Sequence, residues 1–379
     1  MVLRYTPAQS RPGNEGGKWE VQVKAHLAAL AAVSLLLSGA SVFAQQAATA
    51  SAPELPYEAV PGMFKAPAGD TLGEMQGVAT NSKGHVFSFF RGPQTRLWEF
   101  GADGKFIREI GKGFYGFAFA HSVRVDRHDN IWTVDEGTNV VTKFDPTGSK
   151  VLMVIGYRPR MSDGPYATPK GPNPPDDNYT LCRPTDVAWD QHDNVFISDG
   201  YCNNRVVKYS PDGRFLAKVG GAAPGKGVNQ FSLPHGLQVD HQGNVYVADR
   251  SNNRYVVLDN DLKWKTTYDN VGTAWSACIS QGAHQYLFVS NSNPNGNGPG
   301  SWAKTGQIYK MELDGTVLGK FGHAGKMAPG FQVVHMMDCR DPNRIIEGEI
   351  ESWRMQEFVL KGSSAAAPAA KPQTKKGSN

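Results

Sequence analysis

An internal repeat is the feature that most constrains the fold of this 379-residue chain. Three segments share one order of residues: HSVRVDRHDNIWTVDEGTNVVTKFDPTG from His121, TDVAWDQHDNVFISDGYCNNRVVKYSPDG from Thr185, and HGLQVDHQGNVYVADRSNNRYVVLDND from His235. A looser copy begins at Gln76, and two degenerate copies follow, the second of which begins at His335. Repetition on this scale indicates a repeat architecture rather than an ordinary β-sandwich.

Each repeat carries the signals of four short β-strands. Runs of β-branched and aromatic residues, such as VYVAD and VVTKF, are bounded by turns rich in Asp, Asn and Gly. Six units of four strands predict an all-β, six-bladed β-propeller over residues 70–361. The segment 45–69 precedes it, and we expect the part from Tyr57 to Lys65 to supply a strand that closes the ring with the last blade. Residues 159–180 and 291–300 are predicted to be loops.

The two ends of the chain lie outside the repeat. At the N-terminus, basic residues precede an apolar run from Leu27 to Leu37, and Val42 and Ala44 occupy the −3 and −1 positions of a cleavage site. We therefore expect residues 1–44 to be a signal peptide, with an uncleaved membrane anchor as the alternative. The rest of the chain has no long apolar stretch, which predicts an exported protein, periplasmic or secreted, without stable membrane insertion after cleavage. The low-complexity tail 362–379 is expected to be disordered.

The charge balance argues against one class of partner. The chain has 39 Lys and Arg against 35 Asp and Glu, and these charges are dispersed along it. No basic face of the kind that nucleic-acid-binding proteins present is visible in the sequence. We therefore expect no nucleic-acid partner.

Four cysteines fit an oxidising compartment, where disulfides persist. Cys182 and Cys202 flank two adjacent predicted strands, so that they are placed to bridge. Cys278 and Cys339 remain as a second pair with weaker support from the sequence. The alternative is four buried thiols, and no CxxC spacing suggests a zinc ribbon or a redox motif.

Histidine occupies one repeat position in alternate units. We call the residue just before the first strand of a unit the aligned position. In chain order it holds Gln76, His121, Thr185, His235, an unassigned residue near Ser276, and His335. Alternate blades of a six-membered ring are related by about a third of a turn, so the three imidazoles should converge on the axis. Such a set suits a metal ion with an open coordination position, whereas the alternative for each histidine alone is a structural role.

A second set of residues is expected on the same face of the propeller. Arg91 and Arg250 lie fifteen residues after the aligned position, and Tyr201 lies at the corresponding corner of the third unit. Two guanidinium groups suit a carboxylate, and a tyrosine near cations can have a lowered pKa and act as a base. The alternatives are pairing of the arginines with blade-end aspartates such as Asp249, and a packed rim aromatic at Tyr201.

Three stretches of the chain resemble a known family. They are CRPTDVAWDQHDNVFISDGYCNNRVVKYSPDGRFLAKVG from Cys182, FSLPHGLQVDHQGNVYVADR from Phe231, and FFRG around Arg91. The repeat resembles the NHL family, and these stretches are similar to the peptidyl-α-hydroxyglycine α-amidating lyase domain. The motif DGYCN is the most specific of them, because plain NHL repeats rarely carry Tyr-Cys at that corner.

The resemblance implies a fold, a set of site residues and a cofactor. The fold is a six-bladed propeller, and the implied zinc ligands are His121, His235 and His335. The implied catalytic residues are Tyr201, Arg91 and Arg250, and the family disulfide matches Cys182 with Cys202. The family also holds a structural calcium, partly through backbone carbonyls that match Val78 and Val123. Here Met336 stands where the family usually has Asp directly after the third histidine, and a thioether is a poor calcium ligand.

The implied reaction cleaves the N–Cα bond of a peptidyl α-hydroxyglycine and gives a peptide amide and glyoxylate. We therefore hypothesise a metal-dependent lyase that acts on a small-molecule or peptide substrate with a carboxylate. The alternative is a non-catalytic NHL propeller that serves as a periplasmic scaffold for a protein or ligand. A calcium-dependent lactonase is a weaker alternative, because the channel of such an enzyme is lined by Asp, Glu and Asn rather than by histidine.

Overall fold

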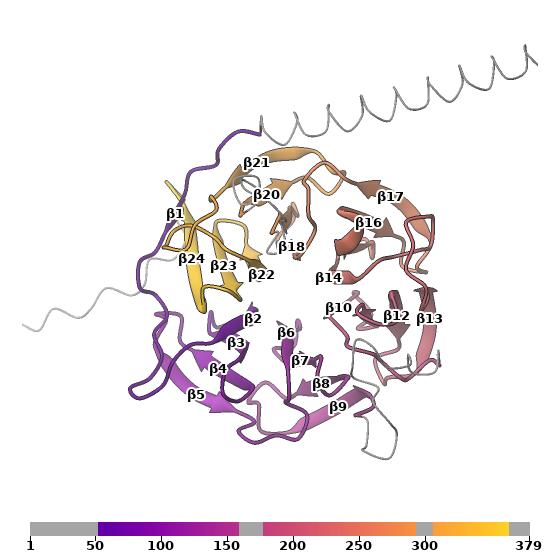
Figure 1. Cartoon of the computed structure of the whole chain (residues 1–379), viewed down its shortest axis with the longest axis horizontal. Helices are drawn as coiled ribbons and strands as arrows, with labels where there is room; N and C mark the ends of the chain where they lie inside the picture. The colour runs from indigo at the N-terminus through magenta and orange to yellow at the C-terminus, as the bar shows by residue number, and fades with distance from the viewer. Residues whose placement is uncertain (1–51, 159–176, 293–305, 364–379) are drawn as a thin grey trace, which may run out of the picture. The chain divides into compact units, whose positions relative to one another are not determined.

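The fold is known from a computed structural model that describes residues 52–158, 177–292 and 306–363. These residues form six four-stranded antiparallel sheets arranged around a central axis, as Figure 1 shows. The innermost strands are β2, β6, β10, β14, β18 and β22, whose labels ring the centre of the view. The prediction of an all-β, six-bladed propeller is confirmed.

The blades follow the repeats in chain order. Blade one contains β2 (Glu74–Thr80), β3 (Val86–Arg91), β4 (Arg96–Phe100) and β5 (Phe106–Ile110). Blade two contains β6 (Ala120–Val125), β7 (Ile131–Asp135), β8 (Val140–Phe144) and β9 (Val151–Gly156). Blade three contains β10 (Asp186–Trp189), β11 (Val195–Asp199), β12 (Arg205–Tyr209) and β13 (Phe215–Gly220).

The second half of the ring has the same plan. Blade four contains β14 (Pro234–Val239), β15 (Val245–Asp249), the 3₁₀ turn η2 (Arg250–Asn252), β16 (Arg254–Leu258) and β17 (Trp264–Tyr268). Blade five contains β18 (Ala277–Ile279), β19 (Leu287–Ser290), β20 (Ile308–Met311) and β21 (Val317–Phe321). Blade six contains β22 (Val334–Asp341), β23 (Arg344–Glu349), β24 (Arg354–Leu360) and β1 (Tyr57–Ala59).

Blade six joins the two ends of the propeller. Its strand order is β1-β24-β23-β22, so the outermost strand comes from the N-terminal side of the chain. Tyr57 lies opposite Leu360 in this antiparallel pair. Pairing the first strand with the last closes the ring through backbone hydrogen bonds and covers the outer edge of β24.

An aspartate at the end of the first strand organises the turn that follows it. In blade two, Asp126 accepts hydrogen bonds from the amides of His128 and Asn130, both at 2.9 Å. Asp190 and Asp240 accept the equivalent bonds in blades three and four. This side-chain-to-backbone capping explains the recurrence of the D-x-x-x-N spacing and sets the register of the first two strands.

A second aspartate, at the end of the second strand, holds the loop that leads into the innermost strand. Asp199 accepts a bond from the amide of Cys182 at 2.7 Å, and Asp249 accepts one from Ser232 at 2.7 Å. Each carboxylate is also paired with the arginine that begins the third strand, Arg205 or Arg254. The residue at the aligned position is therefore anchored by local chemistry that is repeated from blade to blade.

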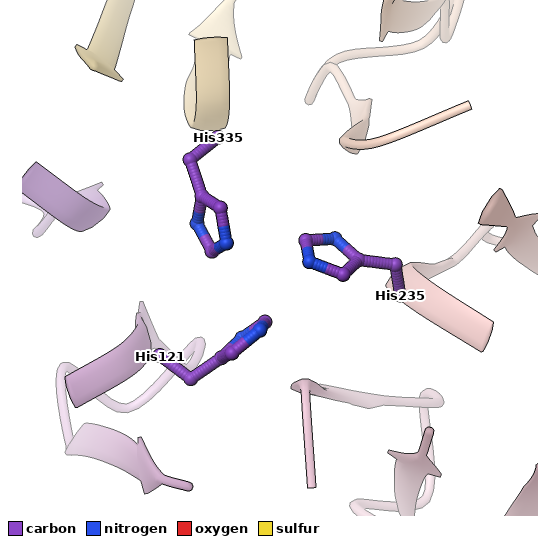
Figure 2. A group of neighbouring side chains, drawn as sticks. All are labelled: His121, His235 and His335. Atoms are coloured by element: carbon purple, nitrogen blue, oxygen red, sulfur yellow. The ribbon is translucent and has the colours of Figure 1, made fainter. Parts of the chain in front are cut away.

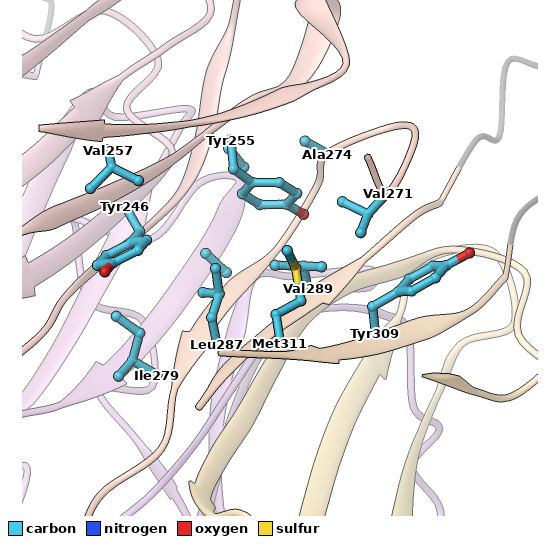
Figure 3. Packing of buried hydrophobic residues seen from close by; sticks show 12 residues of the cluster. Tyr246, Tyr255, Val257, Val271, Ala274, Ile279, Leu287, Val289, Tyr309 and Met311 are labelled. Carbon is cyan, nitrogen blue, oxygen red and sulfur yellow. The ribbon is translucent and has the colours of Figure 1, made fainter. Parts of the chain in front are cut away.

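The hydrophobic core lies between neighbouring blades. Figure 3 shows the cluster between blades four and five, where Tyr246 and Val257 face Leu287 and Met311. Tyr255 is fully buried there, and its hydroxyl donates to the carbonyl of Ser276 at 2.9 Å. Each aliphatic or aromatic side chain that is buried in this way contributes about 1.5–3 kcal/mol. The contacts hold successive blades together and so keep the inner strands around the axis.

Both cysteine pairs form disulfides. The Cys182–Cys202 bridge that the sequence and the family resemblance indicate is confirmed, and Cys278 also pairs with Cys339. The alternative of four buried thiols is therefore wrong. The first bridge lies within blade three, beside Tyr201, whereas the second joins β18 of blade five to β22 of blade six.

Loss of the first bridge is expected to weaken the fold measurably. The two cysteines are 20 residues apart in the sequence. Closing a loop of this size limits the unfolded chain, so that the double variant Cys182→Ser/Cys202→Ser should lose about 3 kcal/mol of unfolding free energy. Denaturant unfolding without added oxidant or reductant measures the difference in unfolding free energy between this variant and the wild type. Cys278→Ser/Cys339→Ser, which lacks the other bridge, is the matched variant. An unchanged unfolding midpoint in the first variant would contradict this expectation.

Several sequence predictions fall outside the described residues. These are the signal peptide at 1–44, most of the predicted loops 159–180 and 291–300, and nearly all of the tail 362–379. Within the described ranges, the chain contains no helix of the length and apolar character that crossing a membrane requires.

Candidate metal centre

A β-bulge places each of the three histidines at the axis. The pairing of β6 with β7 shifts between Ala120 and Ser122, which leaves His121 as the extra residue. The same irregularity occurs around His235 in β14 and around His335 in β22. A bulge rotates one side chain out of the strand's alternation. The innermost strands therefore turn these three side chains into the channel.

The three imidazoles form a compact buried group. Figure 2 shows the rings of His121, His235 and His335 reaching from three blades toward one point. Their ring centroids are 4.7, 4.7 and 4.8 Å apart. One nitrogen from each ring can be chosen so that all three lie within 4.8 Å of one another, and the side chains are at most 1% exposed.

Hydrogen bonds to the backbone determine which nitrogen of each ring faces the axis. The Nδ1–H of His121 donates to the carbonyl of Thr185 at 2.6 Å, and that of His235 donates to Trp275 at 2.8 Å. The Nδ1–H of His335 donates to Gln76 at 2.6 Å. In each case the acceptor is the aligned residue of the next blade, which identifies Trp275 as the aligned residue of blade five. The Nε2 lone pairs are thereby left for another partner.

The environment keeps these rings neutral. Burial lowers the pKa of His121 and of His235 well below the ordinary histidine value, and the neighbouring His335 lowers both further. Burial likewise lowers the pKa of His335 to about 3. The Nε2 atoms of His121 and His235 are buried and have no hydrogen-bond partner among the residues that the structure describes. Neutral imidazoles with converging, unpartnered Nε2 atoms are a ligand set that fits a divalent metal such as zinc.

Tyr201 and Arg250 lie beside the histidine group. The ring centroid of Tyr201 is 5.7 Å from that of His121 and 6.5 Å from that of His235. Arg250 donates from Nη1 to the hydroxyl of Tyr201 at 3.4 Å, and its guanidinium stacks 3.5 Å over the Trp275 ring. Pairing of Arg250 with Asp249 does not occur, because Asp249 is paired with Arg254 at 2.7 Å.

Glu136 is a member of the site that sequence reasoning missed. Its buried carboxylate lies 3.1 Å from Arg91 and accepts a 2.7 Å bond from Nε of Arg183, whose guanidinium is 4.4 Å from the Tyr201 ring centroid. One carboxylate oxygen is 4.0 Å from Nε2 of His121. Glu136 lies fifteen residues after His121, which is the spacing that singles out Arg91 and Arg250. The spacing of fifteen residues from the aligned position, applied to blade two, therefore predicts Glu136 as a site residue.

The pKa of Tyr201 moves in the direction opposite to the sequence expectation. Burial raises it, and the nearby Glu136 carboxylate raises it further. Arg250, Arg91 and Arg183 act in the other direction without overcoming the burial of the ring. The sequence expectation of a lowered pKa considered the neighbouring arginines. It did not include the desolvation of the Tyr201 ring or the carboxylate of Glu136. A metal ion in the histidine group would add positive charge next to this phenol and oppose the rise.

Comparison with known proteins gives this geometry a context. The NHL repeat family matches residues 181–209 and 231–258. The chain is 33% identical to peptidyl-alpha-hydroxyglycine alpha-amidating lyase 1 of Drosophila melanogaster over 279 residues, which are 68% of this chain and 47% of that protein. It is 31% identical to peptidylglycine alpha-amidating monooxygenase of Rattus norvegicus over 54% of this chain and 22% of that protein. The chain is a six-bladed β-propeller that contains NHL repeats and resembles the peptidyl-α-hydroxyglycine α-amidating lyases.

The likeness to these lyases covers only part of each relative, because the chain spans about half or less of the length of the relatives named above. A solved structure of a protein of unknown function from Bacteroides thetaiotaomicron also matches, with a TM-score of 0.53 and 11% identity. That match covers 82% of this chain and 74% of the other, and it concerns the fold alone.

The calcium sphere that the lyase resemblance implies does not fit this NHL propeller. Val78 and Val123 are buried on the neighbouring innermost strands β2 and β6, at the same repeat position. The channel beside them contains the guanidinium of Arg124, whose Nη2 lies 3.5 Å from the sulfur of Met336. A cationic side chain thus lies at the axis beside these positions, and Met336 offers a thioether where the resemblance implies an Asp carboxylate, which a hard cation would need.

Proposed function

We propose that this NHL propeller is a metal-dependent lyase that cleaves the N–Cα bond of an α-hydroxyglycine-type substrate to an amide and glyoxylate. The observation that carries the proposal is the group of three Nε2 atoms, each fixed by a backbone bond at Nδ1, next to the Tyr201–Arg250 pair. The named lyases among its relatives support the same reaction class. Zinc is the metal we propose, because three buried imidazoles with an open position suit it.

The histidines supply the ligands and the rim supplies the acid–base chemistry. When bound, the metal would act as a Lewis acid that lowers the pKa of a hydroxyl group held at the open position. Tyr201, ionised to the tyrosinate by the positive charge of the bound metal and the neighbouring arginines, would accept the proton of the substrate's α-hydroxyl group. As the carbonyl of glyoxylate forms, the N–Cα bond breaks, and Tyr201 returns the proton to the nitrogen of the departing amide. One residue can serve as base and then as acid, so that atoms and protons balance over one turnover.

Two arginines of the site have different roles in this proposal. Arg91 is committed to Glu136 and to the carbonyl of Ala120, which its Nε reaches at 2.8 Å. Arg250 makes one long hydrogen bond to Tyr201 and otherwise rests on Trp275. Arg250 is therefore the residue that binds the substrate carboxylate, whereas Arg91 positions Glu136 and the wall of the site. A guanidinium stacked on an indole is also pre-oriented for a planar anion.

We further propose that the protein works after export, in an oxidising compartment. The Cys182–Cys202 and Cys278–Cys339 disulfides fit such surroundings, because cytosolic thiols are kept reduced. The substrate is a peptide or small molecule that already carries the α-hydroxyl group and a free carboxylate. A preceding hydroxylation reaction must supply that substrate.

Glyoxylate release tests the proposal directly. The purified mature protein, stripped of metal and then loaded with zinc, should release glyoxylate from α-hydroxyhippurate and from a peptidyl α-hydroxyglycine. The metal-stripped protein is the control and should be inactive. If the zinc-loaded protein releases no glyoxylate from either compound above the uncatalysed rate, the lyase proposal is wrong.

A further inference from the structure

A buried guanidinium occupies the channel just below the histidines. Arg124 projects from β6, and its side chain is only 7% exposed. Nε donates to one carboxylate oxygen of Asp186 at 2.9 Å, and Nη2 donates to the other at 2.5 Å. This two-pronged pair joins blade two to blade three in a region that water does not reach.

The guanidinium also bonds to the backbone of more distant blades. Nη1 donates to the carbonyl of Met337 in blade six at 3.1 Å, and Nη2 approaches the carbonyl of Ala277 in blade five at 3.5 Å. These two carbonyls lie two residues after the aligned position, the repeat position that Val78 and Val123 hold in their own blades. The cation is thus bound by the same type of carbonyl that the family resemblance assigns to calcium.

Asp186 extends the connection to the remaining part of the ring. Its carboxylate accepts a 3.0 Å bond from the amide of Leu237 in blade four, besides the two bonds from Arg124. Blade one is tied in separately, because Thr80 donates from its amide and its hydroxyl to Asp338 of blade six, both at 2.9 Å. The charge of Asp338 also acts favourably on Arg124. The axis therefore carries a connected polar network that reaches every blade.

We propose that the Arg124–Asp186 ion pair takes the place of a structural calcium ion as the axial cross-link of this propeller. A permanent positive charge already satisfies the carbonyls and the carboxylate that would ligate a metal there. A calcium ion would have to displace a guanidinium that is held by two hydrogen bonds to Asp186. The fold is then stable without calcium, and within the described ranges the histidine group is the one place left for a metal ion. This inference does not depend on the lyase activity.

The wild-type protein provides the first test. We expect dialysis against micromolar calcium followed by elemental analysis to find no stoichiometric calcium in the chain. The thermal midpoint should be the same in calcium chloride as in calcium-free buffer, with the zinc concentration held equal in both. One calcium per chain, or a midpoint that rises with calcium concentration, would overturn the proposal, since a ligand that binds only the folded state stabilises it by mass action.

A variant provides the second test. Arg124→Met keeps much of the side chain's volume, removes the charge and leaves the carboxylate of Asp186 buried without its partner. We expect a clearly lower thermal midpoint, because an uncompensated buried charge is costly. Arg127→Met is the matched control and should leave the midpoint unchanged, since Arg127, in the turn after β6, makes a solvent-accessible ion pair with Asp193 of blade three. An Arg124→Met protein as stable as the wild type would contradict the proposal, and the calcium measurement stands even if this variant does not fold.

Discussion

His235→Ala is expected to abolish both stoichiometric metal binding and glyoxylate release. His235 contributes one of three Nε2 atoms in the buried group, and alanine leaves two imidazoles and a void that water can enter. Bound metal should fall from one per chain to a small fraction. Because a metal Lewis acid contributes several kcal/mol to the transition state, the activity should fall by about 10³-fold or more. Elemental analysis and the glyoxylate assay measure the two effects on one preparation.

The control for this experiment is another histidine of the same blade. His241 lies in an exposed turn after β14, where its backbone amide donates a hydrogen bond to Gln285 and its backbone carbonyl accepts one from Gln191. His241→Ala should therefore keep the metal and the activity. A thermal melt of both variants separates loss of a ligand from loss of the fold. If His235→Ala kept its full metal content, the histidine group would not be the metal site. A wild-type protein without stoichiometric metal would favour the non-catalytic scaffold alternative.

Tyr201→Phe should keep the metal and lose the proton transfer. The phenol hydroxyl receives its hydrogen bond from Arg250 and lies beside the histidine group, whereas the ring itself packs against His121 and Arg183. Phenylalanine preserves that packing. General acid–base catalysis contributes about 10²–10⁴-fold, so kcat should fall by that amount with little change in KM. Steady-state glyoxylate release at several substrate concentrations resolves the two constants.

Two observations make this second prediction specific. Metal content and thermal midpoint should match the wild type, because no ligand or buried ion pair is altered. Tyr115→Phe is the control, since the Tyr115 side chain is 72% exposed and lies outside the site. If Tyr201→Phe kept the wild-type kcat, the proton acceptor would be another group. Tyr201 would then be a packed rim aromatic, which is the alternative role that the sequence allowed.

Local chemistry explains how much of this molecule the sequence predicts. The aspartates that close the turns and anchor the loops act on amides within about twenty residues, so the same letters recur wherever the same backbone is built. Counting along the repeats is enough to place His121, His235 and His335 at one height in alternate blades. The roles of Tyr201, Arg91 and Arg250 in catalysis remain predictions, as do the signal peptide and the export of the protein.

Contacts between distant segments explain what sequence reasoning supported only weakly or missed. The Cys278–Cys339 bridge, which had weaker support in the sequence, spans 61 residues, and the contact from Arg124 to Met337, which was missed, spans 213 residues. No repeat pattern signals either contact, because each occurs once in the ring. Glu136 has the same spacing from the aligned position as Arg91 and Arg250, but it is an acid, whereas the sequence prediction considered only basic residues at that position. Its carboxylate, together with burial, is also what reverses the expected direction of the Tyr201 pKa.

The sequence by itself determined the architecture, because blade, turn and bulge are built from interactions among residues that are close along the chain. It also determined which residue types face the axis. Only the tertiary structure decided what those residues do to one another: which imidazole nitrogen is left for a metal, which arginine is already paired, and which cation fills the channel. The physical reason is that six separate segments meet at the axis. There the burial of each side chain and its distances to the other segments set its charge state and its hydrogen bonds, and neither property is repeated along the chain.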